Sequence, residues 1–233
     1  MVKSFTDSAH LVSAEGEVLV EVPLTICAPD GAARGGIVVL HESRELTDAF
    51  RELLVMLSDD GWFAVAPNLF HRDQDPGAEV FGSDLFEDFD AAWQWLTEQG
   101  VPRDLIGVLG FDDAGTAAAL VATDRPVGAA VSVAAPGILE PLTTDAEALV
   151  TALPSLKAPW LGLYGEDERI PSEQIEQLQD AAATASVAVL VVQYTGYGHR
   201  ADYENSAVPI DPDDDTIIHA RSRIFDWFNS HLR

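Results

Sequence analysis

The sequence is poor in cysteine and in positive charge. Cys27 is its single cysteine, which excludes an internal disulfide and any metal cluster built on cysteines. Lys3 and Lys157 are the only lysines, and 13 Lys and Arg stand against 39 Asp and Glu, for a net charge of −26. We therefore expect no nucleic-acid partner, because this charge would repel a polyanion.

Long apolar runs are also missing. No run reaches the roughly 18 residues of a membrane span, and the N-terminus, MVKSFTDSAH, lacks the apolar core of a signal peptide. We expect a cytoplasmic protein that does not engage a membrane, and a lone cysteine fits a reducing compartment. The acidity itself fits a salt-adapted or high-GC proteome, or a need for solubility. The sequence leaves the oligomeric state open.

Short apolar runs alternate along the chain with stretches of helical spacing. Strands are predicted over residues 18–26, 36–40, 62–66, 105–110, 127–133, 160–164 and 187–192. Helices are predicted over 45–58, from an N-cap at Ser83 to about 98, and over 114–122, 144–153, 172–183 and 214–232. The alternation predicts one α/β domain over 1–233, with a mainly parallel twisted sheet covered by helices on both faces.

Functional groups of such sheets gather just after the carboxyl ends of the strands. The strongest local signal there is Gly110-Phe111-Asp112-Asp113-Ala114-Gly115, between a predicted strand and a helix of small residues. This pattern has the shape of a nucleophile elbow, in which small residues allow a sharp turn that exposes the third residue. A tight turn with two helix-capping aspartates is the simpler interpretation of the motif alone.

Two further motifs favour the functional interpretation. Asp167 follows the strand over 160–164, and His199 follows the last predicted strand. The chain order is then nucleophile, acid and histidine, as in α/β-hydrolases.

Taken together, these segments make the chain resemble the dienelactone hydrolase family of α/β-hydrolases. The resemblance covers nearly the whole chain and is carried by residues 36–42, 60–70, 110–115, 165–171 and 194–199. It implies an α/β-hydrolase fold without a large cap domain; only residues 134–159 separate the strands between which such a cap is usually inserted. It also implies hydrolysis of small lactones and esters, with no metal or organic cofactor.

The resemblance assigns roles to individual positions. Asp112 stands where the family has a nucleophilic cysteine, Asp167 at the triad acid and His199 at the triad base. The backbone N–H groups of Ser43 and Asp113 match the oxyanion hole. The expected pocket residues are Glu42, which matches a glutamate that contacts the nucleophile, His41, Arg72 and Tyr197. The family's pair of substrate-binding arginines is not clearly present, because Arg72 and Arg200 align poorly, and this argues against a dienelactone substrate.

The aspartate at the nucleophile position changes the expected chemistry. A carboxylate that attacked an ester carbonyl would form a mixed anhydride, uphill from the ester. The same carboxylate can attack a saturated carbon, displace a halide or open an epoxide, and form an enzyme ester that water then hydrolyses. Two alternatives stay open: His199 activates water directly beside a passive Asp112, or catalysis is lost and the pocket binds a ligand or partner. A metal held by His41, Glu42, Asp112 and His199 has no supporting spacing motif.

Overall fold

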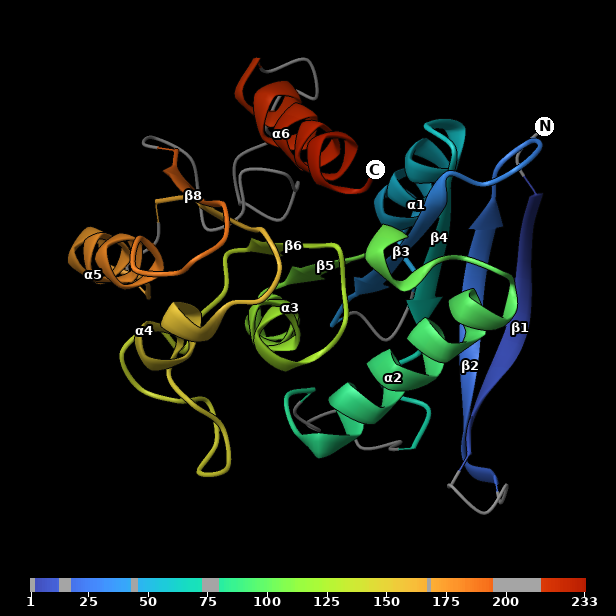
Figure 1. Ribbon diagram of the computed structural model, residues 1–233, viewed down its shortest axis with the longest axis horizontal. Helices are drawn as coiled ribbons and strands as arrows, with labels where there is room; N and C mark the ends of the chain where they lie inside the picture. The colour runs from blue at the N-terminus through green and yellow to red at the C-terminus, as the bar shows by residue number, and fades with distance from the viewer. Residues whose placement is uncertain (1–2, 13–17, 43–45, 73–79, 167–168, 195–214) are drawn as a thin grey trace.

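The fold is built on one eight-stranded sheet. The computed structural model describes residues 3–12, 18–42, 46–72, 80–166, 169–194 and 215–233. The strand order is β1-β2-β4-β3-β5-β6-β7-β8 (Figure 1). The strands are β1 (Lys3–Val12), β2 (Val18–Ala28), β3 (Gly35–Leu40), β4 (Trp62–Pro67), β5 (Ile106–Phe111), β6 (Ala129–Val133), β7 (Trp160–Tyr164) and β8 (Val189–Gln193).

All strands from β4 to β8 in the sheet order run parallel, whereas β1 and β2 pair antiparallel at one edge. The central strands β3, β5, β6 and β7 are buried along their whole length. Their continuous runs of small and branched apolar residues are typical of strands covered on both faces. The predicted mainly parallel sheet is therefore confirmed.

Helices cover both faces of this sheet (Figure 1). On one face, α1 (Asp48–Asp59) and α6 (Asp215–His231) bury Phe50, Leu54, Ile224 and Phe228. The other face is covered by α2 (Ser83–Glu98), α3 (Asp113–Asp124), α4 (Leu149–Ala152) and α5 (Ser172–Ala182). Two short 3₁₀ helices, η1 (Arg103–Leu105) and η2 (Leu153–Ser155), lead into β5 and follow α4. The parallel strands point their carboxyl ends to a common edge, where the site residues are expected.

Three sequence predictions need correction. Strand β1 was not predicted, because its sequence KSFTDSAHLV lies at the sheet edge and Asp7 interrupts its apolar alternation. The predicted N-cap Ser83 is the first helical residue of α2, and Gly82 takes the cap position without a side-chain bond. The predicted helix over 144–153 shrinks to α4, because the N–H groups of Leu149 and Val150 bond the carbonyls of Gly137 and Ile138 instead of a preceding helical turn.

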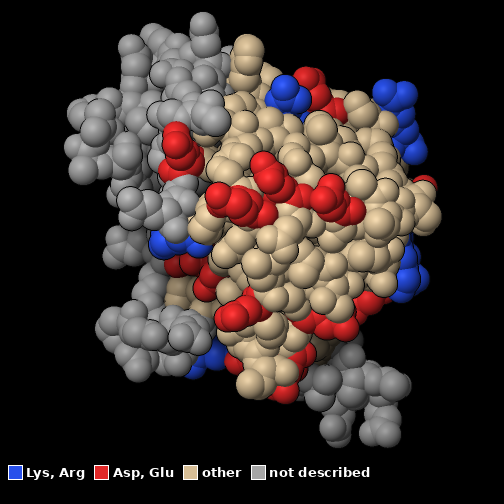
Figure 2. Space-filling view, turned by 90° about the vertical axis from the view of Figure 1, so that its left-hand side faces the viewer, with Lys and Arg blue, Asp and Glu red and all other residues tan. Residues whose placement is uncertain are grey.

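The side of the molecule that carries α5 bears many acidic side chains. Figure 2 shows a row of acidic side chains across that face, with lysine and arginine near its margins. On α5, Glu173, Glu176 and Asp180 are all exposed. Such a face repels polyanions, as expected from the composition. Within the described ranges, no helix is both long enough and apolar enough to cross a bilayer.

Candidate active site

The turn between β5 and α3 has the backbone geometry that the sequence predicts for a nucleophile elbow. Asp112 has φ 55° and ψ −129°. These angles are close to those of the first central residue of a type II′ turn, a position dominated by glycine. A non-glycine residue held there stores about 1–3 kcal/mol of strain, which the surrounding structure must hold in place. The alternative of a capping aspartate is not supported, because Asp112 makes no side-chain cap bond to α3.

Close packing around two glycines makes this turn possible. A Cβ atom on Gly110 would lie 2.1 Å from the carbonyl oxygen of Ala114. On Gly115 it would lie 3.1 Å from the oxygen of Val133 and 3.2 Å from that of Gly110. Helix α3 therefore begins directly against the end of β5, as the small residues of the motif predict.

Backbone hydrogen bonds fix the strained residue on both sides. The Asp112 N–H donates to the Val133 carbonyl at 2.9 Å, which ties the elbow to β6. The Asp112 carbonyl accepts from the N–H groups of Gly115 at 2.8 Å and Thr116 at 3.2 Å. The elbow is thus attached to its neighbouring strand as well as to its own helix.

A buried polar chain behind the elbow was not predicted from the sequence. The Ser132 hydroxyl donates to the Gly115 carbonyl at 2.7 Å and accepts from the Trp160 indole N–H at 2.9 Å. Both side chains are fully buried. A satisfied buried network of this kind rigidifies its surroundings. The only sequence signal for it was a polar serine inside an apolar strand.

Glu42 reaches the elbow from the end of β3. Its Oε1 accepts the Ala114 N–H at 3.1 Å, and its carboxylate also accepts the Asp113 N–H. The structure therefore brings Glu42 and the Asp112 turn together, as the sequence predicts. In this arrangement the Asp113 N–H, which the sequence assigns to the oxyanion hole, is bonded to Glu42.

Three carboxyl groups crowd this edge of the sheet. The pKa of Glu42 is raised to about 7, mainly by burial and then by the negative charges of Asp113 and Asp112. The two backbone N–H groups oppose this shift but do not cancel it. Near neutral pH, Glu42 therefore exchanges a proton directly at the elbow.

This raised pKa predicts a pH-dependent stability. Between pH 4.5 and about 7, folded Glu42 keeps a proton that the unfolded chain has lost, so stability falls as the pH rises through this window. Glu42→Gln keeps the acceptor for Ala114 but cannot ionise. We expect the variant to gain on the order of 2 kcal/mol over the wild type between pH 4 and 8.

Urea unfolding at a series of pH values measures this difference. The control is Glu52→Gln, which removes an exposed carboxylate from α1. Parallel stability curves for wild type and Glu42→Gln would show that Glu42 does not titrate in this range.

Arg72 is held by the carboxylates of α2. Its Nη1 lies 2.6 Å from Asp88 Oδ1 and its Nη2 lies 3.1 Å from Glu87 Oε2, with Asp84 Oδ2 at 3.9 Å from Nε. His71 Nε2 lies 3.0 Å from the same Asp88 oxygen. Asp88 is fully buried, and burial raises its pKa despite both partners. The charge of Arg72 is thus already matched by protein carboxylates, which leaves it poorly suited to hold a substrate carboxylate.

Two tryptophans of α2 are packing residues. The Trp93 indole N–H donates to the Pro126 carbonyl at 3.1 Å, and that of Trp95 donates to Asp7 Oδ2 at 2.9 Å. Both indole N–H groups are therefore satisfied within the protein.

Several predicted site residues lie outside the described residues: Ser43, Asp167, Tyr197, His199 and Arg200. Their roles remain predictions. Of the predicted site, the structure describes His41, Glu42, Arg72, Asp112 and Asp113. In the part of the chain that is described, no three His, Cys, Asp or Glu side chains converge to hold a metal ion.

Comparison with known proteins identifies the family. The family model described as "Dienelactone hydrolase family" matches residues 23–232. This chain is a member of the dienelactone hydrolase family. The resemblance drawn from the motifs is thereby confirmed.

Individual dienelactone hydrolase relatives are distant in sequence. A carboxymethylenebutenolidase of Rhodococcus opacus is 27% identical over 194 residues, which cover 76% of this chain and 74% of its own. An Escherichia coli protein that carries the same name provisionally is 26% identical over 212 residues. These residues cover 84% of this chain and 76% of the relative.

The solved structures confirm the fold. A Klebsiella pneumoniae protein provisionally described as a dienelactone hydrolase superposes with a TM-score of 0.79 at 23% identity, covering 98% of this chain and all of its own. This family member has the α/β-hydrolase fold, and the residues that the structure describes include no large cap domain.

Proposed function

We propose that this dienelactone hydrolase family member hydrolyses a small organic molecule at a saturated carbon, with Asp112 as the nucleophile. The observation that carries the proposal is a carboxylate at the strained elbow position, φ 55°. Strain of this kind persists only where the surrounding structure holds it in place, and it clusters at active sites. Family membership supports hydrolysis of a small organic substrate.

The first proposed step is a displacement. A carboxylate oxygen of Asp112 attacks the carbon, and a C–O bond forms as the bond from carbon to halogen breaks. The halide leaves with the electron pair of that bond, and Asp112 becomes an alkyl ester. With an epoxide, the same attack opens the ring, and the resulting alkoxide takes a proton from an acid, for which we propose Tyr197.

The second proposed step hydrolyses this ester. His199, oriented by Asp167, takes a proton from water as the water oxygen bonds to the Asp112 carboxyl carbon. The tetrahedral intermediate then expels the alkoxide, which takes the proton back from His199 and leaves as an alcohol. Asp112 loses its remaining proton and returns to the carboxylate. Overall, R–X and water give R–OH, a halide ion and a proton.

The backbone N–H groups of Asp113 and Ser43 are the proposed donors to the negative oxygen of that intermediate. The Asp113 N–H is bonded to Glu42 before reaction. Glu42 has a pKa of about 7, so it can take up a proton and become neutral near neutral pH. A neutral carboxyl group accepts the Asp113 N–H more weakly than a carboxylate does. We therefore propose that protonation of Glu42 frees the Asp113 N–H for the intermediate.

A second candidate function is ligand binding without catalysis. It is favoured by the same bond between Glu42 and Asp113, which occupies a donor that the reaction needs, and by the crowding of carboxyl groups around the elbow. In such a protein the pocket of the family would bind a small ligand or a protein partner.

A substrate panel separates the two functions. Purified wild type and Asp112→Asn are compared on haloacids, epoxides, short esters and lactones, at low and high salt. We expect the wild type to turn over haloacids or epoxides, and Asp112→Asn to have lost that activity. Ester or lactone turnover that survives in Asp112→Asn would instead indicate direct attack by water. Inactivity of the wild type on the whole panel would contradict the proposed function.

A further inference from the structure

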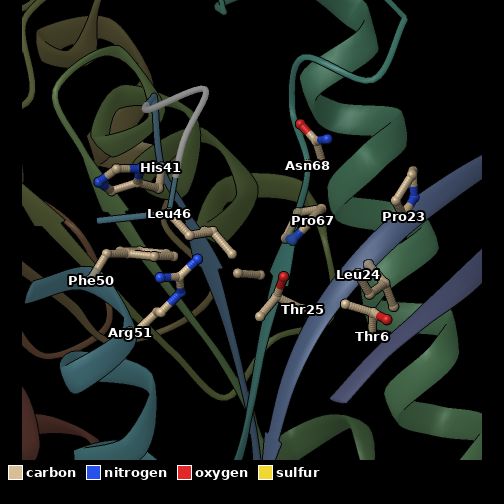
Figure 3. Close-up of a pocket in the computed structure, with 11 residues that line it drawn as sticks. Thr6, Pro23, Leu24, Thr25, His41, Leu46, Phe50, Arg51, Pro67 and Asn68 are labelled. Atoms are coloured by element: carbon tan, nitrogen blue, oxygen red, sulfur yellow. The ribbon is translucent and has the colours of Figure 1, made fainter. Parts of the chain in front are cut away.

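A hollow lies near the carboxyl end of β3, on the face of the sheet that carries α1. Its volume is about 510 Å³, within the usual range of about 300–1,000 Å³ for small-molecule sites. Residues of β1, β2, β4 and α1 surround it, and His41 closes it at the end of β3 (Figure 3). The carbon surface comes from residues such as Leu24, Leu46 and Phe50.

The lining of this cavity differs in charge from the protein as a whole. In a chain of net charge −26, none of the lining residues that the structure describes is an aspartate or glutamate, and Arg51 supplies a positive charge. Hydroxyl groups of Thr6 and Thr25 and the amide of Asn68 add neutral polar groups. The lining is therefore about as polar as it is apolar, and it offers a small molecule both carbon surface and hydrogen-bonding partners.

Arg51 is available to a ligand. Among the described residues, its one ion pair joins Nη1 to Asp48 Oδ1 at 3.4 Å, and the two side chains are 61% and 103% exposed. Exposed pairs of this kind contribute little. Figure 3 shows the Arg51 guanidinium extending from α1 toward the space that Thr25 borders from β2. An anionic group in the cavity would meet this guanidinium with no lining carboxylate in competition.

The cavity is connected to the elbow through His41. The centroid of the His41 ring lies 4.1 Å from that of Phe50 in the cavity wall, with the ring planes tilted by 38°, and 6.2 Å from that of Phe111 in an edge-to-face arrangement. Phe111 directly precedes Asp112, and Glu42, the neighbour of His41, accepts the Ala114 N–H at the elbow. His41 and Phe111 therefore link the wall of the cavity to the residue that precedes the proposed nucleophile.

We infer that this cavity binds the non-reacting part of the substrate, and that this part is an apolar carbon skeleton carrying a carboxylate or similar anionic group. Arg51 pairs with the anion, while Leu46 and Phe50 contact the skeleton. The inference rests on the proposed function for the reacting end of the substrate. It assigns substrate selection to Arg51 rather than to Arg72, whose charge is matched by α2.

A binding experiment tests the cavity without any turnover. Phenylacetate, phenylacetamide and acetate are titrated calorimetrically into wild type, Arg51→Gln and Arg103→Gln. The control residue Arg103 lies in η1, at the amino end of β5 and away from the cavity. We expect Arg51→Gln to weaken phenylacetate binding about tenfold, the loss typical of one charge-assisted bond. Phenylacetamide binding should be unchanged, and Arg103→Gln should match the wild type.

Two results would overturn the inference. Equal phenylacetate affinity in wild type and Arg51→Gln would show that Arg51 does not bind the anionic group. Acetate binding as tight as phenylacetate binding would show that only surface charge is involved and that the apolar wall is not used.

A kinetic experiment separates this inference from the proposed function. Turnover of 3-(chloromethyl)benzoate and of its neutral amide is measured in the same variants. We expect Arg51→Gln to raise the KM of the benzoate about tenfold and to leave its kcat and both constants of the amide unchanged. No turnover of either compound by wild type would refute the proposed function. The calorimetric result would still show whether the cavity binds an anionic ligand through Arg51. An equal rise in KM for both compounds would refute the inference alone.

Discussion

Replacing Asp112 by glycine is expected to remove turnover while stabilising the protein. Glycine adopts φ 55° and ψ −129° without the strain that Asp112 carries, so we expect the free energy of unfolding to rise by about 1 kcal/mol. The loss of the carboxylate removes the nucleophile, and we expect kcat/KM to fall by about 10⁴-fold or more. Urea unfolding and steady-state kinetics measure the two effects on one sample.

A gain in stability together with a loss of turnover in Asp112→Gly would show that the strain at Asp112 is retained for function. Ala134→Gly is the matched control, because Ala134 also has φ 55° and follows β6 at the same edge of the sheet. It releases similar strain but loses a buried methyl group, so we expect a smaller change in stability and activity within a few-fold of wild type. An Asp112→Gly variant that keeps its turnover would show that Asp112 is not the nucleophile.

Gly110→Ala is expected to have a large structural effect at the elbow. Its Cβ would lie 2.1 Å from the Ala114 carbonyl oxygen, so α3 would have to move away from β5. We expect a loss of about 3 kcal/mol in the free energy of unfolding, at the upper end for overpacking. The elbow would shift with the helix, and a displacement of about 1 Å costs about 10²-fold in rate.

Gly128→Ala serves as the control for this steric effect. Its Cβ would lie 2.0 Å from the Asp104 carbonyl oxygen, at the opposite end of the strands from the elbow. We expect a similar loss of stability but nearly normal kcat in the molecules that remain folded at low temperature. Equal kcat in the two folded variants would contradict the requirement for close packing at Gly110.

The central part of the fold and the elbow could be predicted from sequence because their signals are local. Apolar runs such as 36–40 and 160–164 have few alternatives to buried strands, and the motif from Gly110 to Gly115 needs small residues wherever it forms. Glu42 was found through the resemblance, and its contact with Ala114 agrees with that assignment.

The remaining features depend on contacts between distant segments. Strand β1 forms because β2 offers it a partner, and α4 is short because Leu149 bonds Gly137. The cavity beside Arg51 is assembled from several separate segments, and no pattern within any one of them predicts it. Likewise, only the packed structure shows that the charge of Arg72 is matched by α2.

A single-turnover reaction in H₂¹⁸O tests most directly whether Asp112 forms an ester with the substrate. Enzyme in excess is mixed with the haloacid or epoxide of the panel that it turns over fastest. The masses of the product and of the peptide containing Asp112 are then measured by mass spectrometry. Attack by Asp112 places one ¹⁸O atom in the Asp112 carboxyl group and leaves the first product unlabelled, because the product oxygen comes from the aspartate. Label in the first product and none in Asp112 would show direct attack by water and contradict the proposed mechanism.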